Sequence, residues 1–337
     1  MNNIFNYATK ELSQDAYLMW LISSYNDQDE NLASFSKKFI FDLLGVEQKP
    51  IDSIKIYPQL SNIDIVCNIQ IEGKHYLLAI EDKTTSKEHN QFEKYSEELK
   101  DIREKYKNKT KIDLEIKKVF YKTGVIGSDE EERLNNNSEW DKRDIQNIKQ
   151  FYDNNPCDNI LVNQYKEIIN SVYSLYTDQE YDCEMNEINY AKLLNHLRLY
   201  RDNRFILNVT NQRCKVCFQI LKEYHLDDLN FYYGPTIYIE PSYDDALNSQ
   251  WMIWIYFHTT IGDEDKWYQG KNNPNLIRYN DVIIEYARQL LNEFTNARTD
   301  CKMTYYSTKK EKLTRLSKVH EYILKLMEKM NENQLNL

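Results

Sequence analysis

The chain is poor in glycine and lacks the glycine-rich loops that many nucleotide-binding enzymes use. It contains 7 glycines in 337 residues, which is about 2% where roughly 7% is usual. Neither a GxGxxG nor a GxxxxGK[ST] pattern occurs. These absences argue against a dinucleotide-binding or P-loop site built on glycine-rich phosphate-binding turns.

Long apolar runs are also missing. The longest, residues 251–257, is far shorter than the ~20 apolar residues of a transmembrane helix. Residues 1–10 show no basic stretch followed by an apolar segment, which is the pattern of a secretory signal. We therefore expect a soluble cytoplasmic protein with no membrane partner, whose cysteines are mostly reduced thiols.

The charge balance is acidic. Asp and Glu number 53 against 43 Lys and Arg, giving a net charge of -10. An acidic protein is repelled by nucleic acid at long range, so any nucleic-acid function must be argued from a local site. Apolar residues make up 41% of the chain, enough to bury a sizeable core, and the length favours about two domains.

Two carboxylates lie on the apolar stripe of the first predicted helix, over residues 8–25. Glu11, Asp15, Leu18 and Ile22 recur at helical spacing and therefore share one face. The apolar members of this stripe favour burial. The carboxylates are then directed toward the interior as well.

Residues 63–71 and 75–83 alternate with period two and predict the strands of a hairpin. A Glu72-Gly73 turn places Asp64 opposite Glu81, and a Gly73-Lys74 turn places it opposite Lys83. Either register brings Asp64, Glu81 and Lys83 to one face of neighbouring strands. A three-residue loop would instead pair Asp64 with Asp82.

Two carboxylates on opposed strand positions, ~4.5–5.5 Å apart at Cβ, repel each other and need a cation. Lys83 can supply one. A divalent ion such as Mg²⁺ or Mn²⁺ is the stronger candidate, because hard cations take oxygen ligands and retain water. Glu11 could complete the ligand set, with Asp15 as the alternative. A metal-held water approached by an ammonium group is suited to hydrolysis.

A long amphipathic helix is predicted after the hairpin, over residues 86–106. Thr85 and Glu88 fit a capping box at its start. Its apolar stripe consists of Phe92, Tyr95, Leu99, Ile102 and Tyr106.

These residues together resemble the PD-(D/E)XK nuclease superfamily. The pattern Asp64-x16-Glu81-x-Lys83 matches its strand motif, and Gln91 and Tyr95 match the QxxxY element of the RecB-like branch. Glu11 matches the glutamate that the superfamily often carries in its first helix. The chain looks closest to a bacterial PD-(D/E)XK nuclease-like subgroup, on the residues Phe5, Glu11, 20–22 and 79–95.

The resemblance covers about the first 175 residues, and Gln164-Tyr165 is similar to a second Gln-Tyr pair of this subgroup. Two departures stand out. Ile63 precedes Asp64 where the superfamily often has proline. Asp82 is polar where many relatives have an apolar residue, so it needs a partner of its own on the opposite face.

The resemblance implies an α/β fold: a restriction-endonuclease-like mixed sheet flanked by helices over residues 1–178. An α+β region of unassigned role, 179–337, is expected to follow, and it may pack with the first as one unit. The implied activity is Mg²⁺- or Mn²⁺-dependent hydrolysis of phosphodiester bonds, with DNA as partner, in defence against foreign DNA or in DNA processing. Asp64, Glu81 and Glu11 would hold the metal, Lys83 would orient the attacking water, and Gln91 and Tyr95 would bind substrate or brace the site.

Plainer interpretations stand beside this one. Asp64, Glu81 and Lys83 could form an ion pair on an exposed hairpin, and Gln91 and Tyr95 could serve packing alone. The chain could be a catalytically inactive nuclease-fold protein that binds nucleic acid or protein. It could also cut RNA or be activated by a nucleotide. The sequence leaves open whether the protein forms a homodimer.

The remaining patterns predict structure rather than chemistry. Cys214-x-x-Cys217 lacks a second metal-binding pair and is interpreted as buried thiols on a helix. The basic stretch 309–329 is interpreted as a solvated helix face, and the aromatic residues Tyr232, Tyr233, Trp251, Trp254 and Tyr256 as core. Further helices are expected over 34–44 (from Ser34 to a stop at Gly45), 159–176, 187–200, 211–224, 280–295 and 308–330, further strands over 118–122, 231–240 and 251–258, and an exposed insertion over 128–147.

Overall fold

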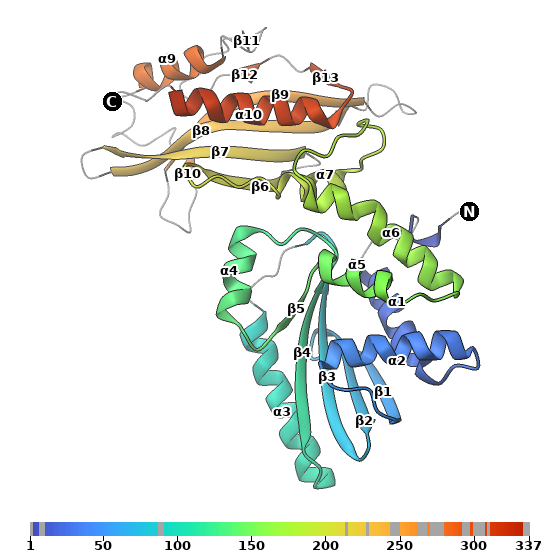
Figure 1. Ribbon diagram of the computed structural model, residues 1–337. Helices are drawn as coiled ribbons and strands as arrows, with labels where there is room; N and C mark the ends of the chain where they lie inside the picture. Colours follow the sequence, from blue (N-terminus) through green and yellow to red (C-terminus); the bar gives the residue numbers. More distant parts are fainter. Residues whose placement is uncertain are drawn as a thin grey trace. The chain divides into compact units, whose positions relative to one another are not determined.

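The computed structural model of the protein forms two compact units, residues 1–177 and 178–337 (Figure 1). From the sequence, the boundary is predicted after residue 178. Each unit has its own β-sheet. The structure describes residues 3–6, 11–86, 91–212, 215–226, 229–242, 250–261, 268–269, 280–291, 297–298, 307–308 and 311–332.

The sheet of the first unit is mixed and follows the chain order β1-β2-β3-β4-β5. β1, β2 and β3 pair antiparallel, whereas β3, β4 and β5 pair parallel. This confirms the expected α/β character with a mixed sheet. The strand bounds are β1 Ile51–Leu60, β2 Ile63–Ile71, β3 Lys74–Lys83, β4 Leu114–Lys122 and β5 Asp141–Arg143.

The β2–β3 hairpin turns through Glu72 and Gly73. Ile71 pairs with Lys74, and the pairing continues without a shift to Ile65 and Ile80. Both turn residues have positive φ, 46° and 76°, as expected for the two-residue turns that match the twist of a hairpin. Extended by one residue, this register sets Asp64 opposite Glu81, so the first of the two odd registers is confirmed.

Helices cover both faces of this sheet. Figure 1 shows α3 and α4 on one side of it and α1 and α2 on the other. Phe92 and Tyr95 of α3 share a buried cluster with Leu77 and Ala79 of β3. These two β3 residues alternate in phase with Glu81, so α3 packs on the face that carries Glu81 and Lys83. The helices of this unit are η1 Ile4–Asn6, α1 Glu11–Ser23, η2 Ser24–Asn26, α2 Glu30–Leu44, α3 Phe92–Thr110, α4 Ser128–Asn136, α5 Ile145–Asn154 and α6 Ile160–Thr177.

The predicted start of the second helix at Ser34 is wrong. α2 begins at Glu30, and the Asp29 carboxylate caps it by accepting hydrogen bonds from two backbone amides, at 3.0 and 3.3 Å. Gly45 ends the helix with a left-handed φ of 62°, as predicted. The cap was missed because Ser34 and Asp29 are both good N-cap residues and only the second has its partners in place.

The long helix after the hairpin also starts later than predicted. α3 begins at Phe92, and Ser86 lies in a bend before it. Glu88 of the predicted capping box is outside the described residues. Likewise, α1 is shorter than the expected 8–25, and residues 7–10 are outside the described part of the chain.

The expectation of an exposed insertion over residues 128–147 is only partly right, because many of its side chains are exposed but others belong to the core. The segment forms α4, β5 and the start of α5, and Glu130 and Trp140 in it are 0% and 4% exposed. The polar composition of the segment suggests exposure to water. Glu130, however, is buried because it pairs with a cation, Lys122 of β4. Burial of a charged residue requires such a partner, and a local pattern cannot show it.

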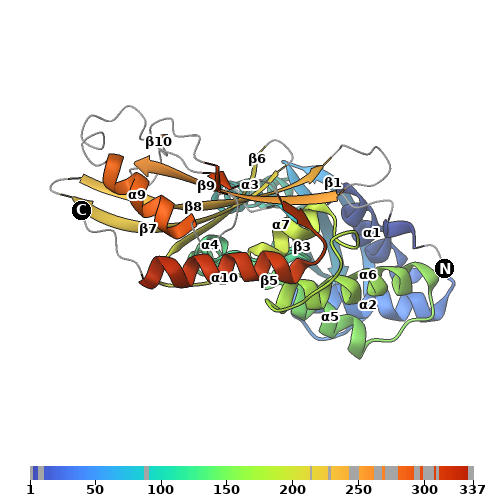
Figure 2. The same cartoon turned by 90° about the horizontal axis from the view of Figure 1, so that it is seen from above.

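The second unit is built on an antiparallel sheet with the main order β11-β12-β9-β8-β7-β6. α10 packs along it and contacts α9 and β8 (Figure 2). One face of α10 is buried, including Val319, Ile323 and Leu326. The helix predicted over 308–330 is therefore confirmed from Leu316 onward, whereas residues 311–313 form the strand β13. The elements are α7 Tyr190–Leu197, β6 Ile206–Gln212, β7 Lys215–Leu226, β8 Leu229–Ser242, β9 Gln250–Ile261, β10 Tyr268–Gln269, α9 Asn280–Leu291, β11 Ala297–Arg298, β12 Ser307–Thr308, β13 Glu311–Leu313 and α10 Leu316–Glu332.

The helix predicted over 211–224 is wrong, since the described residues 211–212 and 215–224 lie in β6 and β7. Val216, Phe218 and Ile220 alternate along β7 and are all buried, which is the period of a strand. Cys217 is a buried thiol, as predicted, but on a strand, and Cys214 is outside the described residues. Tyr233 and Trp251 are buried in this sheet. Within the described residues, no helix is long and apolar enough to cross a bilayer.

Candidate functional site

The structure brings Asp64, Glu81 and Lys83 together at the end of the β2–β3 hairpin. The Lys83 ammonium lies 2.6 Å from Glu81 Oε1 and 3.7 Å from Asp64 Oδ2. The backbone amide of Asp82 donates a hydrogen bond of 2.9 Å to the same Asp64 oxygen. Asp64 lies on β2, and Glu81 and Lys83 lie on β3. The pairing of these two strands therefore fixes how far apart the three side chains are.

Burial makes this cluster electrostatically unusual. The Glu81 side chain is 1% exposed and the Lys83 side chain 10%, so the exposed-hairpin interpretation does not hold. Burial raises the pKa of Glu81 to about 8, with the Lys83 ammonium opposing the rise and the Asp64 carboxylate adding to it. Burial lowers the pKa of Lys83, but the adjacent Glu81 and Asp64 carboxylates more than offset this and hold it above its ordinary value.

The two carboxylate oxygens of Glu81 differ in their contacts. Its Oε1 pairs with Lys83, while its Oε2 is buried and has no hydrogen-bond partner among the residues that the structure describes. An unsatisfied buried carboxylate oxygen is costly, because desolvation is not repaid by any bond. The atom therefore calls for a proton, a water or a cation.

Glu11 reaches the same region from a different element. It is the first residue of α1, and the Ser86 hydroxyl donates a hydrogen bond to its Oε1. Its negative charge is near enough to raise the pKa of Lys83. The structure thus places Glu11 beside the strand cluster, held by the segment that follows β3.

Asp15 and Asp82 form a second acidic pair, on the other face of β3. Asp82 is 0% exposed and accepts a hydrogen bond from the Gln14 amide, whose oxygen accepts one from Thr123 at 3.0 Å. Burial, and the Asp15 carboxylate after it, raise the pKa of Asp82 well above its ordinary value. Gln14 is thus a partner for the polar Asp82. Asp15 lies near enough to Asp64 and Lys83 for their charges to act on its pKa, so this pair adjoins the strand cluster.

Replacing Asp15 by asparagine is expected to flatten the pH dependence of stability. Burial, opposed by the hydrogen bond with Asp82, raises the pKa of Asp15 from 3.8 to about 6. A carboxyl whose pKa is higher in the folded state stabilises the fold below pH ~4 and loses that contribution as pH rises through 6. In EDTA, the thermal midpoint of the variant should therefore exceed that of the wild type more at pH 7 than at pH 4.5. Parallel profiles for the two proteins would contradict this.

Gln91 and Tyr95 lie where α3 begins. Tyr95 is 2% exposed and packs in the buried cluster with Trp140, and its backbone amide donates a 2.9 Å hydrogen bond to the Gln91 carbonyl. Tyr95 thus packs in the core and Gln91 is half-buried at the helix start. Their role in substrate binding or in bracing the site stays a prediction.

The residues present fit a cation that keeps much of its water. Within the described part of the chain, no three Asp, Glu, His or Cys side chains form a ready-made metal cage. Mg²⁺, however, is commonly bound through one or two carboxylates, with water and substrate phosphate completing its shell. Asp64 and Glu81 form such a pair, and the unused Glu81 Oε2 is a free ligand atom among the described residues.

Sequence reasoning missed Lys122 and Glu130, a fully buried ion pair next to the cluster. For Lys122, its position at the end of a strand was the signal that could have identified it. Lys122 ends β4 as Lys83 ends β3, and the two are partners in the parallel register. Glu130 carried no such signal, because the polar stretch around it resembles a solvated loop.

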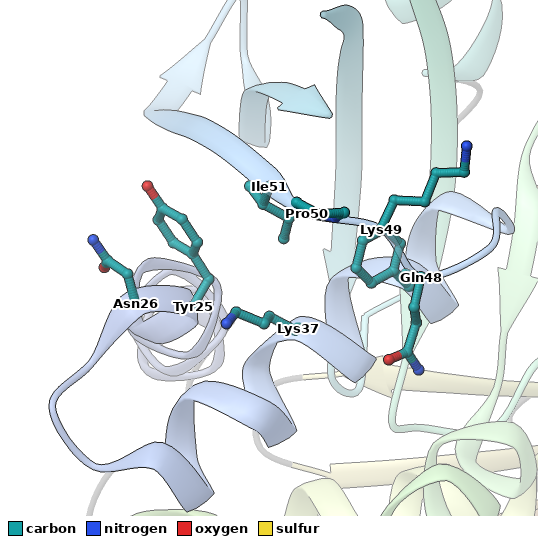
Figure 3. Close-up of a pocket in the computed structure, with 8 residues that line it drawn as sticks. Tyr25, Asn26, Lys37, Gln48, Lys49, Pro50 and Ile51 are labelled. Carbon is teal, nitrogen blue, oxygen red and sulfur yellow. The ribbon is translucent and has the colours of Figure 1, made fainter. Parts of the chain in front are cut away.

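A cavity of about 510 Å³ lies elsewhere in this unit, beside η2, α2 and the start of β1 (Figure 3). β1 pairs through Ile51 with the turn end of the hairpin and through Leu60 with the end that carries Asp64. Nine strand steps separate these ends, roughly 30 Å, so the cavity is not part of the acidic cluster. Its lining consists of Tyr25, Asn26, Lys37, Phe41, Gln48, Lys49, Pro50 and Ile51.

No protein-family model, curated protein or solved structure matches this chain.

Proposed function

We propose that the first unit is a metal-dependent nuclease of the PD-(D/E)XK type, with a restriction-endonuclease-like fold. One observation carries the proposal: the buried Glu81 and Lys83 side chains meet the partly exposed Asp64, and Glu81 Oε2 has no hydrogen-bond partner among the described residues. The excess of negative charge there favours binding of a cation.

The surrounding architecture supports the proposal. The Asp64 and Glu81 strands are neighbours in a mixed sheet with helices on both faces, and the first helix brings Glu11 to the same end. Such convergence of side chains from three elements is costly for stability, because like charges are held together out of water. Sites that bind cations and catalyse reactions commonly carry this cost.

In this proposal Asp64 and Glu81 hold a Mg²⁺ or Mn²⁺ ion, and Glu11 assists through water. When bound, the ion supplies Lewis-acid polarisation of the phosphate and a lowered pKa for a coordinated water. Lys83 donates a hydrogen bond to the attacking water. Its positive charge also offsets the negative charge that builds on the phosphate in the transition state.

DNA is the proposed substrate because of the family resemblance. The net charge of -10 weakens long-range attraction to any nucleic acid, so binding must rely on the metal and on local contacts. A catalytically inactive binding protein with this fold is the alternative, and metal dependence separates the two.

Incubation of the full chain with supercoiled plasmid tests this function. We expect nicking or linearisation in Mn²⁺ or Mg²⁺ and none in EDTA, because without the ion no water is held and activated for attack on the phosphate. A parallel arm with single-stranded RNA separates DNA from RNA as substrate. Absence of cleavage of either polymer in any divalent metal, by protein whose folded state is verified by circular dichroism, would contradict a nuclease.

A further inference from the structure

We propose that the buried ion pair of Lys122 and Glu130 is a positioning element of this site, which holds the segment after β3 and through it Glu11. This inference rests on the proposed function. It concerns residues outside the motif of Asp64, Glu81 and Lys83.

The pair is completely enclosed. Both side chains are 0% exposed, and the Lys122 ammonium lies 2.8 and 2.6 Å from the two Glu130 oxygens. The same ammonium donates a hydrogen bond of 2.9 Å to the backbone carbonyl of Ser86. An ammonium group has three donors, so Lys122 can bind the carboxylate and the Ser86 carbonyl at the same time.

Glu130 is itself fixed at the start of α4. One of its oxygens also accepts a hydrogen bond of 3.3 Å from the backbone amide of Gly127, the residue before the helix. The carboxylate therefore couples three parts of the chain: the entry to α4, the end of β4 and, through Lys122, the bend that contains Ser86.

The connection to the site runs through Ser86. Its carbonyl accepts from Lys122, and its hydroxyl donates to Glu11 Oε1. Ser86 lies three residues after Lys83, and the Thr123 amide donates to the Lys83 carbonyl at 3.1 Å. The end of β4 thus supports both the Lys83 backbone and the orientation of Glu11.

A stabilising role alone accounts poorly for such a pair. Desolvation of two charges consumes much of their attraction, and apolar residues of similar volume are often equally stabilising or more so. Apolar side chains could fill this space, but they could not bind the Ser86 carbonyl. Orientation of that segment is the property that depends on charge here.

The double variant Lys122→Met with Glu130→Met separates positioning from stability, because it removes both charges and leaves neither buried alone. We expect a thermal midpoint close to that of the wild type and faster hydrogen exchange at 84–86. We also expect kcat for plasmid cleavage to be reduced about 10- to 100-fold, as for groups that orient metal ligands, with KM unchanged. Wild-type exchange at 84–86 together with wild-type kcat would overturn the proposal.

Two further variants complete the experiment. Lys118→Met with Glu139→Met removes another ion pair of β4, on the same face as Lys122, and should leave exchange at 84–86 and kcat unchanged. Ser86→Ala keeps the buried pair and removes only the hydroxyl, and should lower kcat with a wild-type midpoint. Wild-type kcat in Ser86→Ala would overturn the link to Glu11 even if the double variant failed to fold.

Failure of this inference is distinguishable from failure of the proposed function. Hydrogen exchange at 84–86 is measured without metal or substrate. If the wild type cleaves nothing, the nuclease proposal fails, while the exchange measurement still reports whether the pair holds the segment.

Discussion

Changing Asp64 to asparagine is expected to abolish Mn²⁺ binding at the strand cluster and to reduce plasmid cleavage by about 10³-fold or more. The fold should persist, because Asp64 Oδ2 accepts a hydrogen bond from the Asp82 amide and the asparagine carbonyl can accept the same bond. The variant therefore loses a charge and little else. Calorimetric titration with Mn²⁺ and a plasmid assay measure the two effects.

Asp52→Asn is a matched control for this variant. Asp52 is also a strand carboxylate that accepts one backbone hydrogen bond, 3.0 Å from the Gly73 amide, but at the turn end of the hairpin. It should bind Mn²⁺ and cleave DNA like the wild type. Equal activity of Asp64→Asn and Asp52→Asn would remove Asp64 from the chemistry.

Changing Lys83 to methionine is expected to lower cleavage while Mn²⁺ binding is retained. The Lys83 ammonium lies within ion-pair distance of both carboxylates, so it competes with a bound cation for their charge. Without it, Mn²⁺ should bind at least as tightly as in the wild type. Cleavage should nevertheless fall by about 10²- to 10³-fold, because the group that stabilises charge in the transition state is lost.

The same variant makes a prediction about stability. In EDTA, removal of Lys83 leaves Glu81 buried beside Asp64 without its counter-ion. Breaking such a pair costs up to roughly 3–5 kcal/mol, and less at a pH where Glu81 takes up a proton. Mn²⁺ should restore most of the thermal midpoint by replacing the missing charge. Lys118→Met, a neighbouring lysine on β4 whose partner Glu139 is 64% exposed, should show no such rescue. Loss of both Mn²⁺ binding and cleavage in Lys83→Met would assign Lys83 a structural role instead.

The strand cluster was predictable because its determinants are local. A two-residue turn and the period of two in residues 63–83 fix the register, and the register alone puts Asp64, Glu81 and Lys83 on one face. Glu11 required one more step, the inward stripe of the first helix. The structure adds the Ser86 hydroxyl that holds it.

The features that sequence reasoning missed depend on contacts between distant segments. Glu130 is polar in sequence and fully buried in the fold because Lys122 meets it there. Gln14 of α1 connects Asp82 of β3 to Thr123, which follows β4. In β7, Cys217, Leu221 and Tyr224 share a helical spacing, yet pairing with β6 and β8 makes the segment a strand. Tertiary pairing overrides local preference in such short apolar segments.

Anomalous diffraction from crystals soaked in Mn²⁺ tests the central claim most directly. The account predicts a manganese peak between the Asp64 and Glu81 carboxylates, within contact distance of Glu81 Oε2, which has no hydrogen-bond partner among the described residues. It also predicts that the peak disappears in crystals of Asp64→Asn. A wild-type map with no manganese there, and Lys83 still seated between the two carboxylates, would contradict a metal-dependent site.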